Sequence, residues 1–316
     1  MVHYLIRRLL FMIVALFIAS VIIFAITSVL PGDVAQMILG QNVTPQALHA
    51  LRQKLGLDKP VYVRYLEWIG SALHGNLGTS LSIPGVRISW LLVTRGENTL
   101  FLAFFAGLFL IPTSLGFGIV AGLKEGSWVD NLISSVGLIA ISLPEFVSGL
   151  LLITLFSVWL RVLPATSSID LHHNLFSQFP KLVLPILTVS FVIFGYILRM
   201  ARVSVIEVSR ADYIRTAILK GLPRRRVIIS HIVHNALLPS ITVIAMNMGW
   251  MMGGLVVTET VFAFPGLGRL LLFALKQRDI PLLQATILTV GAIYLFLNLL
   301  ADITYGFLNP QVRYNE

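Results

Sequence analysis

Few residues in this 316-residue sequence have the types and spacing that chemistry requires. His231 and His234 stand three positions apart, which would place both on one face of a helix and could bind a metal ion. No third ligand lies near them in the sequence, so we interpret them as a loop feature. The adjacent His172 and His173 could capture nickel, although solvated histidines account for such a pair more often. We therefore predict no metal site.

The motifs of catalysis and nucleotide hydrolysis are absent from the sequence. It has no Gly-Lys dipeptide, so it cannot form the loop GxxxxGK[ST], in which a lysine beside a glycine-rich turn reaches the phosphates. HExxH, GxSxG and paired carboxylates are missing, and without a cysteine there is no thiolate ligand or nucleophile. We expect no catalytic residue in this chain and no cofactor bound by it.

The composition indicates a membrane protein. Hydrophobic residues make up 57% of the chain and charged residues 12%, whereas a soluble domain is roughly a quarter charged. The net charge of +9 could indicate nucleic acid, but the basic residues gather beside apolar stretches. There they favour contact with anionic lipid headgroups. We predict an all-α, polytopic membrane protein that has no nucleic-acid partner.

About six stretches are long enough to span a membrane, which takes about 20 apolar residues in a helix. One of them, Leu132–Leu160, contains a single charge, Glu145. Five contain no Asp, Glu, Lys or Arg: Leu9–Leu30, Thr99–Leu123, Leu182–Leu198, Asn235–Thr258 and Pro281–Ala301. Prolines inside the spans predict kinks, and glycines would permit close helix contacts: Pro112, Pro144, Pro185 and Pro239, and Gly116, Gly118, Gly249, Gly253 and Gly254.

The basic residues predict the orientation of the spans. Arg7 and Arg8 precede the first span, and eight Lys and Arg lie between Arg199 and Arg226. Cytoplasmic loops carry such an excess, so we expect both termini to be cytoplasmic. The predicted division is a first transmembrane helix (1–30), an external amphipathic segment (31–98), a five-helix core (99–308) and a cytoplasmic tail (309–316).

The external segment has the pattern of two helices. Thr44 and Pro45 are typical of an N-cap followed by the first helical residue. A second amphipathic helix would begin at Val61 and end before Gly75. We favour a small cap on the bundle over a membrane-surface element.

A second polar segment, 206–238, lies on the predicted cytoplasmic side. The sequence predicts a short helix from Ala211 to Lys220, ended by Gly221 and Pro223, and a second helix from Arg224 into the fifth span. A short helix projecting from the membrane suits docking onto a cytoplasmic partner. A basic loop without a partner is the alternative that the residues alone leave open.

This segment resembles the coupling loop of bacterial ABC-importer permeases of the dipeptide/oligopeptide/nickel branch. The general loop pattern is Glu-Ala-Ala, three residues, then Gly; here Arg215-Thr216-Ala217 and Gly221 stand at those places. The departures from the general pattern are similar to the peptide branch. The block Val257–Gln284 also resembles that branch, as do the opening and the end of the chain.

The resemblance implies a type I ABC importer permease fold in the bacterial inner (plasma) membrane. It further implies a second homologous permease subunit, two ATPase subunits that bind ATP and Mg²⁺, and a periplasmic or lipid-anchored binding protein. Nucleotide binding would close the ATPases and switch the bundle from inward-facing to outward-facing. The residues that would seat in an ATPase groove are Asp212, Tyr213, Arg215, Thr216, Ala217, Lys220, Gly221 and Leu222.

Four residues are candidates for the pathway or a gate. Glu145 could face the pathway and meet a peptide amine, because an ionisable group in hydrocarbon is by default a functional hypothesis; it could also lie at a kink with a hydrogen-bonding partner. Met251 could line a passage for varied peptides, although core packing is the commoner role. Asn247 could face the passage or bond a neighbouring helix, and Glu259 could serve a gate or a structural hydrogen bond.

The resemblance favours di- or oligopeptides as substrate. Nickel chelates, glutathione or oligosaccharides are the alternatives within the same class. A self-sufficient secondary transporter is the alternative from another class, but it needs intramembrane acids for ion coupling, and only Glu145 clearly qualifies.

Overall fold

A computed structural model describes residues 2–29, 44–54, 58–169 and 175–308. These residues form helices and no β-strand, apart from an isolated bridge between Thr79 and Arg87. A backbone N–H or C=O in hydrocarbon finds no water, so each must be paired inside the protein, and a helix does this within one segment. The prediction of an all-α membrane protein is confirmed.

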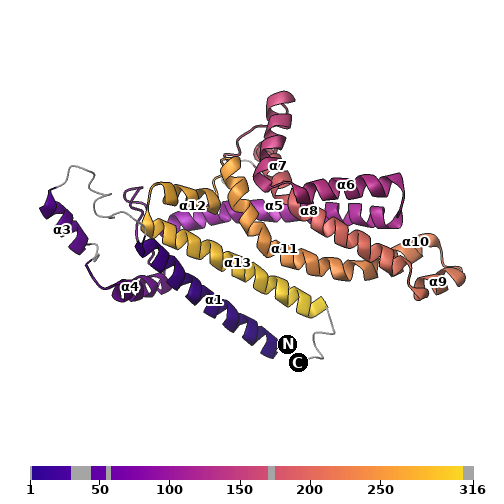
Figure 1. The fold of residues 1–316 in the computed structure, drawn as a ribbon, viewed down its shortest axis with the longest axis horizontal. Coiled ribbons are helices and arrows are strands. Elements are labelled where there is room, and N and C mark those ends of the chain that lie inside the picture. The colour runs from indigo at the N-terminus through magenta and orange to yellow at the C-terminus, as the bar shows by residue number, and fades with distance from the viewer. Residues whose placement is uncertain (1, 30–43, 55–57, 170–174, 309–316) are drawn as a thin grey trace.

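Five helices are long and apolar enough to cross a membrane. Four of them extend past the predicted apolar stretches by a turn or more, because Lys and Arg near a helix end can place their charged groups in the headgroup region. Figure 1 shows α1 and α13 side by side, with α11 beyond them. The five are α1 (Val2–Val29), α5 (Ile88–Leu123), α8 (Leu175–Ser209), α11 (His234–Val261) and α13 (Ile280–Leu308).

The predicted span Leu132–Leu160 is broken at Pro144, where the sequence predicts a kink. It consists of α6 (Trp128–Ser142) and a second segment, α7 with η1 (Glu145–Trp159), bent by 113°. The break lies at Leu143 and Pro144. Proline has no N–H for the ladder, and it pushes the residue before it out of the helical region; Leu143 accordingly has φ −92° and ψ 125°. The six-span count therefore holds only if the bent pair counts as one span.

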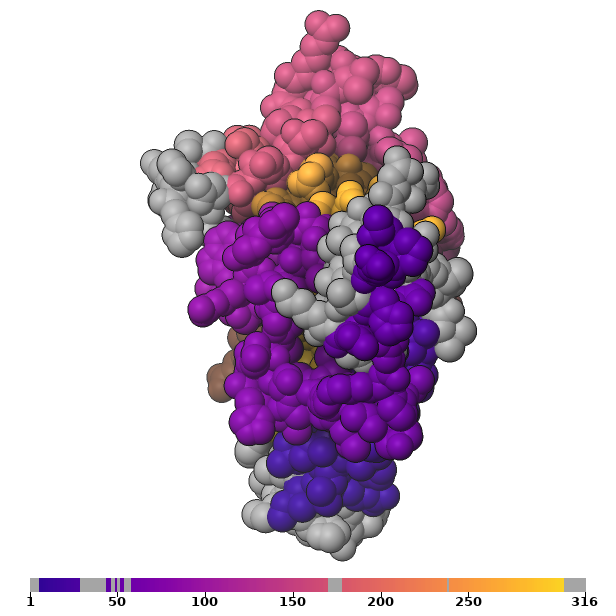
Figure 2. Space-filling model, turned by 90° about the vertical axis from the view of Figure 1, so that its left-hand side faces the viewer, coloured from indigo at the N-terminus to yellow at the C-terminus, as the bar shows by residue number. Residues whose placement is uncertain are grey.

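The segment after the bend stands away from the other helices. Figures 1 and 2 both show α7 (Glu145–Leu152) and the following π-helical η1 (Ile153–Trp159) projecting from the body of the bundle. Large apolar side chains on this segment are exposed, including Leu151 and Trp159. In a membrane protein such a surface is covered by lipid or by another membrane helix.

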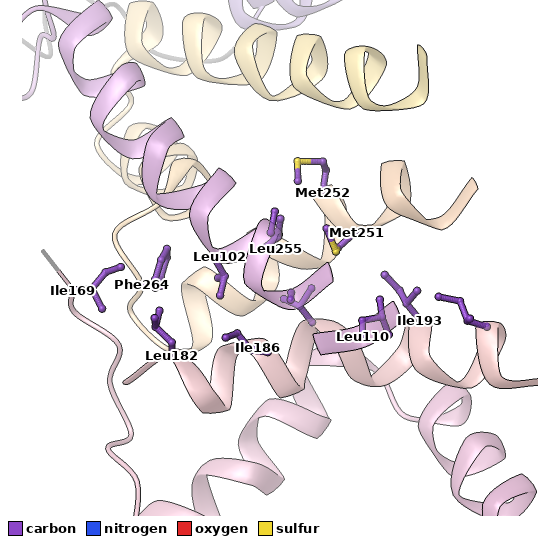
Figure 3. Packing of buried hydrophobic residues seen from close by; sticks show 14 residues of the cluster. Leu102, Leu110, Ile169, Leu182, Ile186, Ile193, Met251, Met252, Leu255 and Phe264 are labelled. Carbon is purple, nitrogen blue, oxygen red and sulfur yellow. The ribbon is translucent and has the colours of Figure 1, made fainter. Parts of the chain in front are cut away.

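The main hydrophobic cluster lies between α5, α8 and α11. Figure 3 shows Leu102 and Leu110 of α5 facing Ile186 and Ile193 of α8, with Met251 of α11 beside them. Each of these five side chains is at least nine-tenths buried. Met251 therefore has a packing position, which is the commoner role that the sequence predicts for it.

Glycines let α8 approach α5 and α6 closely. A Cβ atom built on Gly118 of α5 would lie 2.6 Å from Ala201 Cβ and 2.7 Å from the Leu198 carbonyl oxygen of α8. One built on Gly122, a turn later, would lie 2.7 Å from Val205 Cβ. Small residues four apart on one face are a recurrent means of packing membrane helices. By contrast, Gly116 has no neighbour within 4 Å, so its predicted role in a close contact is wrong.

Two short helices follow α1 in the chain. Helix α3 (Pro45–Lys54) begins at the predicted proline, and α4 (Val61–Leu73) spans the predicted second helix. The rings of Tyr65 and Trp68 pack on Phe24 of α1 with centroids 5.5 and 5.6 Å apart, respectively, from the Phe24 centroid. Helix α4 therefore packs beside α1.

The bundle has two ends, named here by the short helices that they carry. The α9 end carries α9 (Asp212–Leu219), and the α12 end carries α12 (Leu267–Lys276). Near the α9 end, Arg8 Nη1 of α1 lies 2.6 Å from Asp302 Oδ2 of α13. The beginning of the first span and the end of the last span therefore meet, as Figure 1 also shows.

The close approach of α5 to α8 predicts that Gly118→Ala destabilises the protein. The added methyl group meets backbone that cannot yield cheaply, and overpacking of this kind costs about 1–3 kcal/mol. The matched control is Gly116→Ala on the same helix, which has open space and should be neutral or slightly stabilising. Thermal unfolding of the purified protein in detergent measures both, and equal melting temperatures would contradict the packing argument.

Candidate functional site

The segment that the sequence marks for docking folds as the predicted short helix. Helix α9 spans Asp212–Leu219, within the predicted Ala211–Lys220. Gly221 ends it with a φ of +76°, a left-handed conformation that glycine adopts without steric cost. The Gly221 N–H donates to the Ile218 carbonyl at 2.9 Å, which satisfies one of the last helical carbonyls.

One face of α9 anchors it to the bundle. Ile214 and Ala217 are buried in a hydrophobic cluster that α8, η2 (Val227–Val233) and α11 complete. At its other side, Tyr213 Oη accepts a hydrogen bond of 3.1 Å from Asn235 Nδ2. These contacts connect α9 to η2 and to the beginning of α11.

The opposite face of α9 is exposed, and we call it the docking surface. Of the residues predicted to dock, Tyr213, Arg215, Thr216 and Lys220 lie on this face, whereas Ala217 is buried against the bundle. Ile218 and Leu219 were not predicted; they are 61% and 79% exposed. Apolar residues on both faces of a short helix were the signal that could have found them, because only one face can pack on its own bundle. The docking surface consists of Tyr213, Arg215, Thr216, Ile218, Leu219 and Lys220.

Two ion pairs hold the turn between α5 and α6 to the end of α8. Arg202 donates to Asp130 from Nε at 2.6 Å and from Nη2 at 2.8 Å, and the Asp130 side chain is 1% exposed. Arg210, two turns nearer to α9, pairs with the exposed Glu125 at 2.8 Å. The sequence predicts neither pair, because no local pattern connects positions 72 and 85 residues apart.

Glu259 is fully buried and binds the beginning of α12. Its Oε1 accepts from Thr99 Oγ1 at 2.6 Å, and its Oε2 accepts from the Gly268 N–H at 2.6 Å. A carboxylate at this position satisfies free N–H groups and complements the positive end of the helix dipole. Glu259 thereby joins α11, α5 and α12 at one point.

Two glycines beside Glu259 leave room for its carboxylate. A Cβ atom on Gly266 would overlap the carboxylate, and one on Gly268 would overlap Val256 as well. Asn98 of α5 adds a hydrogen bond of 2.7 Å from Nδ2 to the Pro265 carbonyl. The Pro-Gly-Leu-Gly turn at 265–268 thus surrounds and binds the Glu259 carboxylate.

Asp279 performs a similar task at the start of α13. Its side chain accepts hydrogen bonds from Ser80 Oγ, from the Leu81 N–H at 2.8 Å and from the Leu282 N–H at 3.1 Å. Ser82 adds two more, through its N–H and its hydroxyl. The loop before α5 is therefore fastened to the turn between α12 and α13.

Glu145 lies at the bend of the broken span, as the first residue of α7. Its carboxylate lies against Gly254 of α11, where a Cβ atom would collide with it. Within the described part of the chain, this carboxylate has neither a hydrogen bond nor an ion pair. The kink was predicted from Pro144, but the predicted hydrogen-bonding partner is not found there.

The other two pathway candidates occupy different surroundings on α11. Asn247 is partly exposed, and its Nδ2 donates to the Val243 carbonyl of its own helix at 2.8 Å. Met251 is 1% exposed inside the main cluster, which is a packing position.

The histidines do not assemble a metal site in the described residues. No group of three or more His, Asp and Glu side chains has suitable geometry there. His231 and His234 lie on η2 and at the start of α11, beside the docking helix. His172 and His173 lie outside the described residues.

These observations define a polytopic membrane protein that presents a short helix at one end of its bundle. The family model for binding-protein-dependent transport system inner membrane components matches residues 114–314, and the model for their N-terminal part matches 1–86. The chain belongs to this family, and it is a multi-pass inner-membrane permease subunit of an ABC importer rather than an enzyme. The resemblance seen in the sequence is confirmed, and the family implies ATPase and substrate-binding partners.

Relatives are similar over nearly the whole chain. The probable peptide ABC transporter permease protein y4tP of Sinorhizobium fredii is 35% identical over 311 residues, 98% of this chain and 99% of its own. The glutathione transport system permease protein GsiC of Escherichia coli (strain K12) is also 35% identical, over 314 residues, 99% of this chain and 100% of its own.

The buried ion pair predicts a large loss of stability in Asp130→Asn. Removing one partner of a buried pair leaves the other charge uncompensated and costs about 3–5 kcal/mol. The Arg202 side chain is 28% exposed, which places the expected value near the low end. The control Glu125→Gln removes an exposed pair and should cost less than about 1 kcal/mol. Denaturant titration of the detergent-solubilised protein measures both; a smaller effect for Asp130→Asn than for Glu125→Gln would refute the assignment.

Proposed function

We propose that this chain is a translocation subunit of an ATP-driven peptide importer. It acts with a second homologous permease subunit, two ATPase subunits that bind ATP and Mg²⁺, and a periplasmic or lipid-anchored binding protein. The docking surface on α9 carries the proposal. Two exposed aliphatic side chains, Ile218 and Leu219, flanked by Arg215 and Lys220 favour contact with another protein over contact with water.

The absence of a phosphate-binding loop supports a separate energy source. A chain without a Gly-Lys dipeptide cannot hold nucleotide in that way. ATP hydrolysis therefore belongs to the partner subunits, and its energy must reach the membrane through protein contacts. Helix α9 packs on the bundle with one face and is exposed on the other, so it can contact both the bundle and a partner subunit.

Peptides are the substrate class that the relatives favour. One relative is described as a peptide permease and the other as a glutathione permease, and glutathione is itself a tripeptide. Short peptides fit both descriptions. Neither relative's name includes nickel or an oligosaccharide.

The α9 end is the cytoplasmic end in this proposal. Eight Lys and Arg between 199 and 226 gather there, together with Arg7 and Arg8. The positive-inside rule assigns such an end to the cytoplasm. Both termini then face the cytoplasm, and α4, α12 and the loop held by Asp279 face outward.

Coupling follows the contacts of α9. Closure of the ATPases would displace α9, which moves η2 and α11 through the buried Ile214 and the Tyr213–Asn235 hydrogen bond. The Asp130–Arg202 pair extends the displacement to α5 and α6. At the far end of α11, Glu259 ties that helix to α12, so the outer gate would respond to the same motion.

The docking role predicts that Leu219→Asp abolishes ATPase association. Burying a carboxylate in an apolar interface costs more than the contact stabilises, so the ATPase should be lost on affinity purification of this chain in detergent. Leu73→Asp is the control, since Leu73 is 81% exposed at the far end of α4. Both variants should express equally.

Two further variants test coupling itself. Arg215→Glu and Gly221→Pro should keep the complex assembled but lower peptide uptake per ATP hydrolysed, because they alter the surface or the end of α9. Proteoliposomes with the partner subunits give this ratio. ATPase retention by Leu219→Asp, or normal uptake by both further variants, would contradict the docking role. Uptake driven by an ion gradient without ATPases would instead favour a secondary transporter.

A further inference from the structure

Glu145 differs from the other deeply placed carboxylates of this chain. Asp130, Glu259 and Asp279 are each at most 1% exposed, and each accepts at least three hydrogen bonds. Those three acids have structural tasks that account for their burial. The Glu145 carboxylate, although partly buried, accepts none from the described residues.

The position of Glu145 is set by two features of the backbone. Pro144 breaks the span, so the chain turns by 113° and the first residue of α7 points its side chain at α11. Gly254 then leaves room for the carboxylate, since any larger residue would collide with it. Both features are needed to bring an acid against the middle of another spanning helix.

The surface of α11 next to this carboxylate is open. Met246 and Trp250 are 72% and 53% exposed, and Gly253 has no neighbour within 4 Å. These residues follow one another at helical spacing, so they form one stripe, and Gly254 lies at its edge one turn beyond Trp250. Tyr196 of α8 joins the stripe through an edge-to-face contact with Trp250, with ring centroids 6.4 Å apart.

A carboxylate and two exposed aromatic rings are complementary to an organic cation. Ionised groups in hydrocarbon need a counter-charge, and aromatic faces attract an ammonium group. The nearest acid on α11, Glu259, is already occupied by α12 and Thr99 and cannot share the task. An unblocked peptide carries a protonated amine at its N-terminus, and a lysine-containing peptide carries another.

We propose that Glu145 binds the protonated amine of a peptide during its passage, with the Trp250–Tyr196 stripe beside it. Glu145 is then a specificity-determining residue that favours substrates with an amine. This inference rests on the proposed function as a peptide importer. It adds the chemical group that the membrane subunit itself recognises.

Uptake by the complete importer in proteoliposomes tests the proposal. Three peptides serve as probes. Alanyl-alanine has an N-terminal amine, N-acetyl-alanyl-alanine has no amine, and N-acetyl-alanyl-lysine has a side-chain amine only. Each variant is compared with wild type for the same peptide, so that the selectivity of the binding protein cancels. Glu145→Gln removes the charge at constant size, Glu145→Asp keeps it, and Glu97→Gln is a matched control on an exposed acid of α5.

Glu145→Gln should lower alanyl-alanine uptake at least about tenfold, because it removes one partner of a charge pair in a weakly hydrated site. Glu145→Asp should retain most of the uptake, and Glu97→Gln all of it. Uptake of N-acetyl-alanyl-lysine, which keeps a side-chain amine, should fall in Glu145→Gln, whereas uptake of N-acetyl-alanyl-alanine, which has no amine, should be unchanged; an equal fall for both blocked peptides would overturn the proposal. Equal alanyl-alanine uptake by wild type and Glu145→Gln would overturn the proposal. So would an equal loss of alanyl-alanine uptake in Glu145→Asp, which would indicate a structural role.

A second measurement does not depend on uptake of blocked peptides. Because the chain has no cysteine, Gly253→Cys introduces a single reporter at an open position beside an intact Glu145. Saturating alanyl-alanine with binding protein and ATP should slow N-ethylmaleimide labelling of Gly253→Cys several-fold, and leave labelling of Glu97→Cys unchanged. Unchanged labelling of both would contradict substrate contact. Failure of wild type to import any peptide would instead refute the proposed function.

Discussion

Lipid offers no hydrogen-bonding partner to a backbone N–H or C=O, so every spanning segment must satisfy these groups inside the protein. The long helices do this along their own length. The one break within a span shows how narrow the exception is: after Pro144, the N–H groups of Val147 and Ser148 both bond to the Pro144 carbonyl, at 3.0 and 3.1 Å. The chain resumes a helix within a single turn, and the bend thereby becomes a stable feature on which a side chain can be positioned.

Buried carboxylates fasten the connections that helices alone leave loose. Asp130 holds the α5–α6 turn to α8, Glu259 holds the start of α12, and Asp279 holds the loop before α5. Each accepts several N–H or O–H groups, which offsets the cost of taking a charge out of water. Their partners lie far away in sequence, so each acid joins segments that hydrophobic packing alone would leave free to slide.

The same framework links the docking helix to the opposite end of the molecule. Helix α9 packs on the beginning of α11, and Glu259 near the other end of α11 binds α12. Glycine-mediated contact of α8 with α5 at Gly118 and Gly122 leaves little room for these helices to move separately. In the proposed mechanism, a displacement at one end would move whole helices, and Glu145 lies beside α11.

Hydropathy, charge and turn residues in the sequence by themselves determined the all-helical membrane class, the short helix ended by Gly221 and the start of α3 at Pro45, because these depend on local backbone preference and on the length of apolar stretches. Only the tertiary structure decided that Pro144 divides a span while the other prolines of the long helices are accommodated within them. It alone gave Asp130 and Glu259 their partners, and left Glu145 without one among the described residues. The physical reason is that a side chain's environment depends on which distant helices pack beside it, and local sequence carries no record of that neighbour.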